Sequence, residues 1–215
     1  MALVVVIGRV ADSGPNQPAT IIKGPNYNEV AKPDSATPNA TRTSVESGAA
    51  PEVASKPQPR VAMPADEIEF IRAVQQGQAA FRAAPNEMAR GGTRSQRRLA
   101  ICRILTGLSI SGWVGQIEKL SSNSDGRGVL EISIADSIRV ETWNNDLSDA
   151  SDRTLIDPTS PLFAALSQMK QRDEVVFSGT FFPSGTDCVE EHSISLEGSM
   201  TDPEFMFRFQ SVRVP

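Results

Sequence analysis

The second half of the chain shows the two-residue alternation of apolar and polar positions that is typical of half-buried strands. Residues 129–135 (VLEISIA) and 138–143 (IRVETW) alternate most clearly. Residues 204–214 (EFMFRFQSVRV) follow the same rule, whereas residues 174–182 (EVVFSGTFF) are apolar on both sides. The pattern predicts four strands, of which 174–182 is buried on both faces.

An earlier strand is predicted over residues 108–120 (LSISGWVGQIEKL). A strict alternation places Trp113 and Ile117 on one face and Ile110 on the other. Glycines inside this strand favour a bulge or a sharp bend of the kind that closes small barrels. Residues 192–198 indicate a short additional strand before the last one.

Two helices are predicted before these strands. The first covers residues 66–84, where apolar positions recur at spacings of three and four and acidic residues occupy the first turn. The second begins at Thr93 or Ser95, after the glycine pair at 91–92, and ends at Leu105. We expect the two helices to form a hairpin that covers an open face or one end of the strand domain.

A further helix is predicted over residues 160–170, between the third and fourth strands, from its apolar stripe at helical spacing. Three strands, a helix and two strands is the order of elements in a small OB-type barrel. The predicted fold is mainly β (α+β), with a helical hairpin over residues 65–107 and a five- to six-stranded OB-like barrel over residues 108–215.

Residues 1–64 lack the composition of a folded domain. Residues 1–8 (MALVVVIG) are too short to span a bilayer, which takes about 20 residues, and they fit either a soluble N-terminus or the end of a longer membrane anchor. Residues 11–64 are rich in Pro, Ala, Ser and Thr, and we expect a disordered linker. The hydrophobic content of 39% agrees with a large segment outside the core.

The chain has two cysteines, Cys102 and Cys188, which form no CxxC motif. They fit one disulfide in an oxidising compartment or two buried thiols in the cytosol. A disulfide would join the second helix to the loop after the fourth barrel strand. A disulfide would place the protein in the periplasm or tethered to the inner membrane, whereas two free thiols would place it in the cytoplasm.

The order of strands, the inserted helix and the glycines of the first strand together resemble the OB-fold superfamily. The segments SGWVG (111–115), LSSNSDG (120–126) and TWNN (142–145) also resemble an uncharacterised group of bacterial proteins that carry such a domain after a membrane-proximal linker. The OB superfamily implies a binding surface on strands two and three. On this chain the surface would comprise Glu131, Ser133, Arg139, Glu141 and Trp143.

Arginines are concentrated around the second helix, and no acidic residue lies between Glu87 and Glu118. The cluster comprises Arg90, Arg94, Arg97, Arg98 and Arg103. On a helix the first four would share one face, which could contact phosphate or carboxylate. The alternative is a solvated face, or one that bridges to acidic residues of the barrel. As candidate ligand-binding residues we take Arg94, Arg97, Arg98, Glu131, Arg139 and Trp143.

Catalytic and metal-ligating motifs are missing from the sequence. His192 is the sole histidine, and neither a GxSxG motif nor a cysteine pair with metal-ligand spacing occurs. A histidine at this place is therefore predicted to lie in a loop or on the surface. We expect no enzymatic activity, no cofactor and no metal.

These observations predict a non-enzymatic binding or protein-interaction module of the bacterial cell envelope. Its partner would be a protein or an oligomeric ligand, and the N-terminus would supply any membrane tether. The alternative is an intracellular accessory protein that binds single-stranded nucleic acid through the arginine cluster and the barrel face. The net charge of −5 does not favour that alternative, because the overall field repels phosphate.

Overall fold

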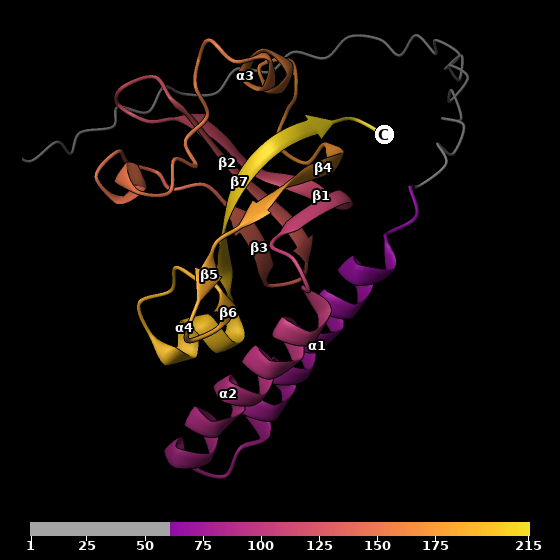
Figure 1. Cartoon of the computed structure of the whole chain (residues 1–215), viewed down its shortest axis with the longest axis vertical. Helices are drawn as coiled ribbons and strands as arrows, with labels where there is room; N and C mark the ends of the chain where they lie inside the picture. Colours follow the sequence, from indigo (N-terminus) through magenta and orange to yellow (C-terminus); the bar gives the residue numbers. More distant parts are fainter. Residues whose placement is uncertain (1–60) are drawn as a thin grey trace, which may run out of the picture. The chain divides into compact units, whose positions relative to one another are not determined.

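A computed structural model describes residues 61–215, and the predicted apolar start and most of the predicted linker lie outside them. The described part contains four α-helices and seven strands (Figure 1). In chain order they are α1 (Ala65–Ala83), α2 (Glu87–Ile104), β1 (Ser109–Ser122), β2 (Gly128–Ala135), β3 (Ile138–Glu141), α3 (Pro161–Leu166), β4 (Glu174–Phe181), β5 (Pro183–Ser184), β6 (Cys188–Val189), α4 (Leu196–Thr201) and β7 (Glu204–Arg213).

Five strands close into a barrel in the order β1-β2-β3-β7-β4. Strands β3 and β7 are parallel, and the other neighbours are antiparallel. Helix α3 lies in the connection between β3 and β4, and β5 pairs only with β6 in a separate two-stranded sheet. The predicted fold class is confirmed, and the closed mixed barrel is compatible with an OB-like fold.

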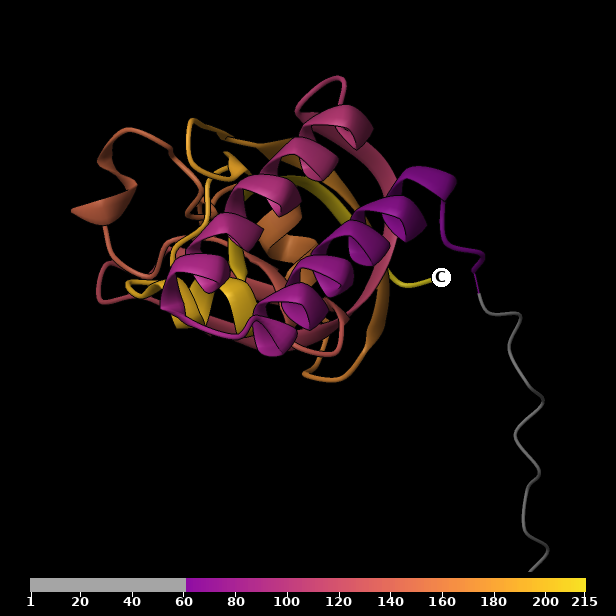
Figure 2. The same ribbon diagram turned by 90° about the horizontal axis from the view of Figure 1, so that it is seen from below.

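The helical hairpin covers one end of the barrel, whereas α3 lies near the other end (Figures 1 and 2). Phe70 of α1 is fully buried among the aromatic rings of Trp113, Phe181 and Phe205, with centroid distances of 5.2–5.6 Å. The indole nitrogen of Trp113 donates a hydrogen bond of 3.0 Å to Asp66. The hairpin is thus an integral part of the hydrophobic core.

Strand β1 departs from the predicted alternation at Gly112, whose φ is +75°. The pairing with β4 shifts there, between Ser111 and Trp113. Ile110 and Trp113 are consequently both buried, so the prediction that they lie on opposite faces was wrong. The prediction that a glycine would provide a bulge in this strand is confirmed.

Two other predicted elements are corrected by the structure. Helix α2 starts at Glu87, because the side chain of Asn86 accepts a hydrogen bond from the Ala89 amide, and the helix continues through the glycine pair. Residues 192–198 do not form a strand. The Ser195 hydroxyl instead caps α4 by accepting from the Gly198 amide at 3.0 Å.

A carboxyl group is buried between α1 and β1. Both oxygens of Glu67 accept from the Val114 amide at 3.0–3.1 Å, and the residue is fully buried. Burial raises the pKa of Glu67 to about 7, opposed by the Val114 hydrogen bond and aided by the charge of Asp66. Between pH 4.5 and about pH 7, the Glu67 carboxyl is therefore mostly protonated in the folded protein and mostly ionised in the unfolded chain.

Stability is accordingly expected to fall as the pH rises from about 4.5 to 7, by up to about 3 kcal/mol for this group. Glu67→Gln retains an acceptor for Val114 but carries no charge, so it should flatten this part of the pH profile and exceed wild-type stability above pH 7. Urea denaturation across this range measures both effects. Glu69→Gln, at an exposed position of α1, is the matched control, and an unchanged slope in Glu67→Gln would contradict the assignment.

The two cysteines form a disulfide in the structure and are not free thiols. Cys102 and Cys188 are bonded, with an S–S distance of 2.11 Å and a Cα–Cα distance of 5.5 Å. The bond joins α2 to β6, after the fourth barrel strand, as the sequence predicts. Such a bond indicates an oxidising compartment. None of the helices in residues 61–215 combines the length and the hydropathy of a bilayer-spanning segment.

Candidate functional site

Two of the five arginines of α2, Arg94 and Arg97, attach the hairpin to the barrel domain. Arg97 is only 1% exposed, and its Nη2 lies 2.7 Å from Oδ1 of Asp187. Its other terminal nitrogen donates to the Ser199 carbonyl. Arg94 reaches the same carboxylate, with Nε 2.9 Å from Oδ1. Two of the three predicted anion-binding arginines are therefore engaged inside the protein.

Asp187 is ionised in this pair of contacts. Burial alone would raise its pKa, but hydrogen bonds from Arg94 and Arg97 outweigh burial and hold the pKa below its ordinary value. Arg98, the third predicted arginine of α2, is half-buried and forms no salt bridge within residues 61–215. The arginines predicted to share one face thus have different roles. Arg94 and Arg97 bind Asp187 inside the protein, whereas Arg98 remains partly accessible.

The predicted barrel residues Glu131 and Arg139 do lie together, on the outer side of β2 and β3. Arg139 Nε is 3.0 Å from Glu131, and its Nη2 is 2.8 Å from Asp202 and 2.9 Å from Glu204. Glu204 is the register partner of Arg139 across the parallel β3–β7 pair. Three carboxylates therefore share the single positive charge of one guanidinium.

More carboxylates surround this arginine than it can neutralise. Burial raises the pKa of Glu131, and the charges of Glu141, Glu118 and Glu204 raise it further, while Arg139 lowers it. We call this surface the acidic face, and it comprises the side chains of Glu118, Glu131, Glu141, Asp202 and Glu204 around Arg139. Its charge favours cations over phosphate groups.

Trp143 lies at the margin of the acidic face and is half-buried. Its indole nitrogen donates to Asp152 at 2.8 Å, and its ring contacts the imidazole of His192 edge-on, with centroids 4.5 Å apart. Nδ1 of His192 lies 2.9 Å from Glu141 Oε1. The hydrogen bond with Glu141 raises the pKa of His192, and burial opposes that shift.

His192 occupies the loop between β6 and α4. The loop or surface position expected for the histidine itself is therefore correct, although the strand predicted over residues 192–198 is not. It does not form a hydrolytic triad with its sequence neighbours, because the Ser193 hydroxyl donates to Glu191 and Asp187 is paired with arginines. Its proximity to Glu141 was not predicted. The two residues are 51 positions apart, and the sequence carries no local signal that joins them.

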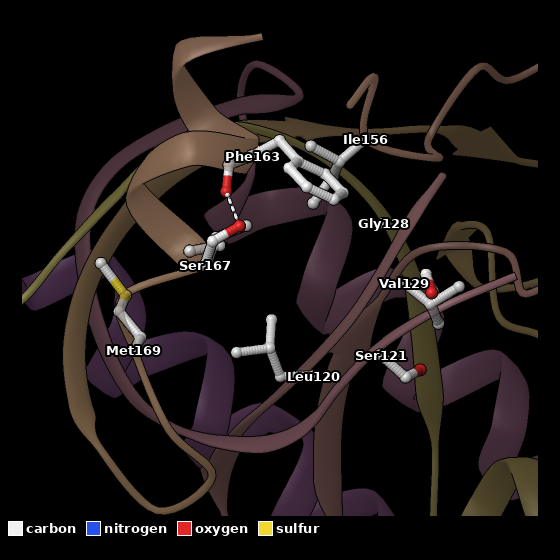
Figure 3. A pocket seen from close by; sticks show the side chains of 10 residues that line it. Leu120, Ser121, Gly128, Val129, Ile156, Phe163, Ser167 and Met169 are labelled. Atoms are coloured by element: carbon white, nitrogen blue, oxygen red, sulfur yellow. Dashed lines mark hydrogen bonds between the residues drawn. The ribbon is translucent and has the colours of Figure 1, made fainter. Parts of the chain in front are cut away.

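A separate apolar hollow lies between the β1–β2 hairpin and α3 (Figure 3). It has a volume of about 250 Å³ and is lined mainly by Leu120, Val129, Ile156, Phe163 and Met169. The hydroxyl of Ser167, which points toward it, already donates to the Phe163 carbonyl at 2.8 Å. Because no ionisable side chain of residues 61–215 lines this hollow, it offers less specific chemistry than the acidic face.

Comparisons with protein-family models, curated proteins and solved structures find no match for this chain. The choice of the acidic face as the candidate site consequently depends on its geometry and charge. Of the six predicted binding residues, Glu131, Arg139 and Trp143 lie on or beside this face, whereas Arg94, Arg97 and Arg98 belong to α2.

Proposed function

We propose that this protein is a non-enzymatic binding module of the bacterial cell envelope that recognises a basic segment of a partner protein. The observation that carries the proposal is the grouping of five carboxylates around one arginine on the outer side of the barrel. Lysine and arginine side chains of a partner would relieve the mutual repulsion of these carboxylates. Charge complementarity of this kind directs association and sets specificity.

The surroundings of the acidic face support a binding role. Glu131 and Glu141 have side chains only 16% and 12% exposed, so their charges are screened less by water than those of free surface residues. Trp143 adds an aromatic ring at the margin of the same surface, where a partner's guanidinium could stack. These features suit a short cationic segment better than a nucleic acid, whose phosphates carry the same charge as the face.

The envelope location is supported by the disulfide. Structural disulfides persist in oxidising compartments, of which the bacterial periplasm is one. Cys102 is exposed to solvent, so the reductants of the cytosol could reach and reduce the disulfide. A protein that relies on this bond is therefore best suited to function outside the cytosol.

The proposal predicts that a fluorescent oligolysine peptide binds the purified protein in the presence of EDTA, with an affinity that falls as salt is added. The double variant Glu118→Gln/Glu131→Gln should weaken binding about 3- to 10-fold, a combined loss of about 0.7–1.4 kcal/mol for the two charges. Fluorescence anisotropy measures the affinities. The double variant Glu69→Gln/Glu87→Gln, at exposed positions of the helical hairpin, removes two charges away from this face and serves as the control.

Equal binding by the Glu118→Gln/Glu131→Gln variant and by the control would count against the acidic face, because only a diffuse attraction to the whole acidic protein would then remain. Binding that does not respond to salt would likewise contradict charge-based recognition. An unlabelled peptide of the same length without lysines must fail to compete.

A further inference from the structure

Three potential metal ligands meet at the edge of the acidic face. Glu141, His192 and Glu204 each place one ligand atom within 4.8 Å of the other two. Nδ1 of His192 lies between the carboxylates, 2.9 Å from Glu141 Oε1 and 3.8 Å from Glu204 Oε2. We propose that these three side chains form a binding site for a divalent transition-metal ion such as Zn²⁺.

The backbone holds the three ligands in place before any ion arrives. Glu204 is paired with Arg139 across the parallel β3–β7 pair, so Glu141, two residues beyond Arg139, projects to the same side of the sheet. The amide of His192 donates to the Glu204 carbonyl at 2.9 Å, which fixes the loop beside the start of β7. Three separate segments of the chain thus converge through contacts of the barrel itself.

Neighbouring side chains orient the ligands. Arg139 Nη2 binds Glu204 Oε1 at 2.9 Å and leaves Oε2 directed toward His192. The Trp143 ring packs edge-on against the imidazole of His192. Contacts of this kind around metal ligands set their orientation and raise metal affinity.

The spacing is close to that of a tetrahedral site. Zn²⁺ bonds of about 2.0–2.1 Å place tetrahedral ligand atoms about 3.4 Å apart. The two observed distances from Nδ1 lie on either side of that value, and the three ligand atoms all lie within 4.8 Å of one another. Side-chain movements of no more than about 1.4 Å would therefore bring the three atoms to tetrahedral spacing. One nitrogen and two carboxylate oxygens leave a fourth position for water, and this ligand set suits zinc and its neighbours in the first row.

The charge of the surroundings favours a doubly charged ion. The acidic face concentrates negative charge that Arg139 only partly neutralises. The side chains of His192, Glu141 and Glu204 are 33%, 12% and 32% exposed, so an ion can reach them and still be partly withdrawn from water. The site goes beyond the proposed recognition of a basic segment, since it requires only these three side chains.

The test uses the full chain without an affinity tag, so that His192 is its only histidine. Calorimetric titration with zinc chloride should give one site per chain, and cobalt chloride should produce visible d–d absorption bands of low-coordinate Co²⁺. His192→Ala and Glu141→Gln should each weaken zinc binding by at least about 10- to 100-fold, the loss typical of an outer-shell partner, because each removes a direct ligand. Glu190→Gln is the matched control, because Glu190 is a half-buried acid of the same loop that is not among the three ligands.

Absence of zinc binding in the wild-type protein would overturn the proposal, as would unchanged affinity in His192→Ala. Thermal melting of each variant without metal verifies that it folds, and Glu141→Gln provides a second test if His192→Ala does not. Because peptide binding is measured in EDTA, failure of the metal site and failure of the basic-partner proposal are observed separately.

Discussion

Replacement of Asp187 by alanine is expected to destabilise the protein by about 3–5 kcal/mol, because it leaves a buried guanidinium without its counter-charge. Arg97 is 1% exposed and has no other carboxylate within salt-bridge distance in residues 61–215. Arg94 loses its main partner at the same time. Urea denaturation measures the loss, and Glu69→Ala, at an exposed position on α1, should change stability by no more than about 0.5 kcal/mol.

The same contact has a defined pH dependence. Since the pKa of Asp187 is lowered in the folded state, its contribution to the free energy of unfolding is present above the ordinary aspartate pKa and is lost as the pH falls through the lowered value.

Replacement of both partners, as in Arg97→Met/Asp187→Leu, should recover much of the stability lost in Asp187→Ala. A loss below about 1 kcal/mol in Asp187→Ala would show that the pair is more hydrated than its burial indicates.

Removal of the disulfide is expected to have a similarly large effect. Cys102 and Cys188 are 86 positions apart in the sequence, and for a loop of this length chain entropy predicts a stabilisation of about 4.6 kcal/mol. For a domain of this size that corresponds to a fall in melting temperature of about 10 °C. The double variant Cys102→Ser/Cys188→Ser and the reduced wild type should melt at the same lowered temperature.

Cys102 is exposed, so a reductant can reach the bond in the folded protein. The double variant is its own control, because reductant must not change its melting temperature further. A wild-type protein that melts at the same temperature with and without reductant would contradict a stabilising role for this bond.

The strands and the hairpin could be predicted because their signals are local. The alternation in β2 and β3 follows directly from burial of one face, and the apolar stripe of α1 follows from its packing on the barrel end. Errors arose where a single residue changes the geometry. Gly112 moves Ile110 to the buried face, and the Asn86 cap starts α2 before its glycines.

The candidate site could be predicted only in part. Glu131 and Arg139 lie on strands that are consecutive in sequence, so their proximity follows from the predicted hairpin. Glu204 joins them through the parallel β3–β7 pair, whose strands are 63 residues or more apart in the sequence, so no local pattern predicts this contact. His192 lies in a loop that was predicted as a strand. The buried Arg97–Asp187 pair spans 90 residues and depends on how the hairpin docks.

An amide NMR titration of the isotope-labelled protein tests whether basic partners bind at the acidic face. Oligolysine and single-stranded oligothymidine are each titrated in EDTA at low salt. Oligolysine is expected to shift resonances of β2, β3 and the start of β7, including those of Glu131, Arg139 and Glu204, whereas oligothymidine is expected to leave them unchanged. Binding of oligothymidine at these strands, with no response to oligolysine, would contradict the account and support nucleic-acid recognition instead.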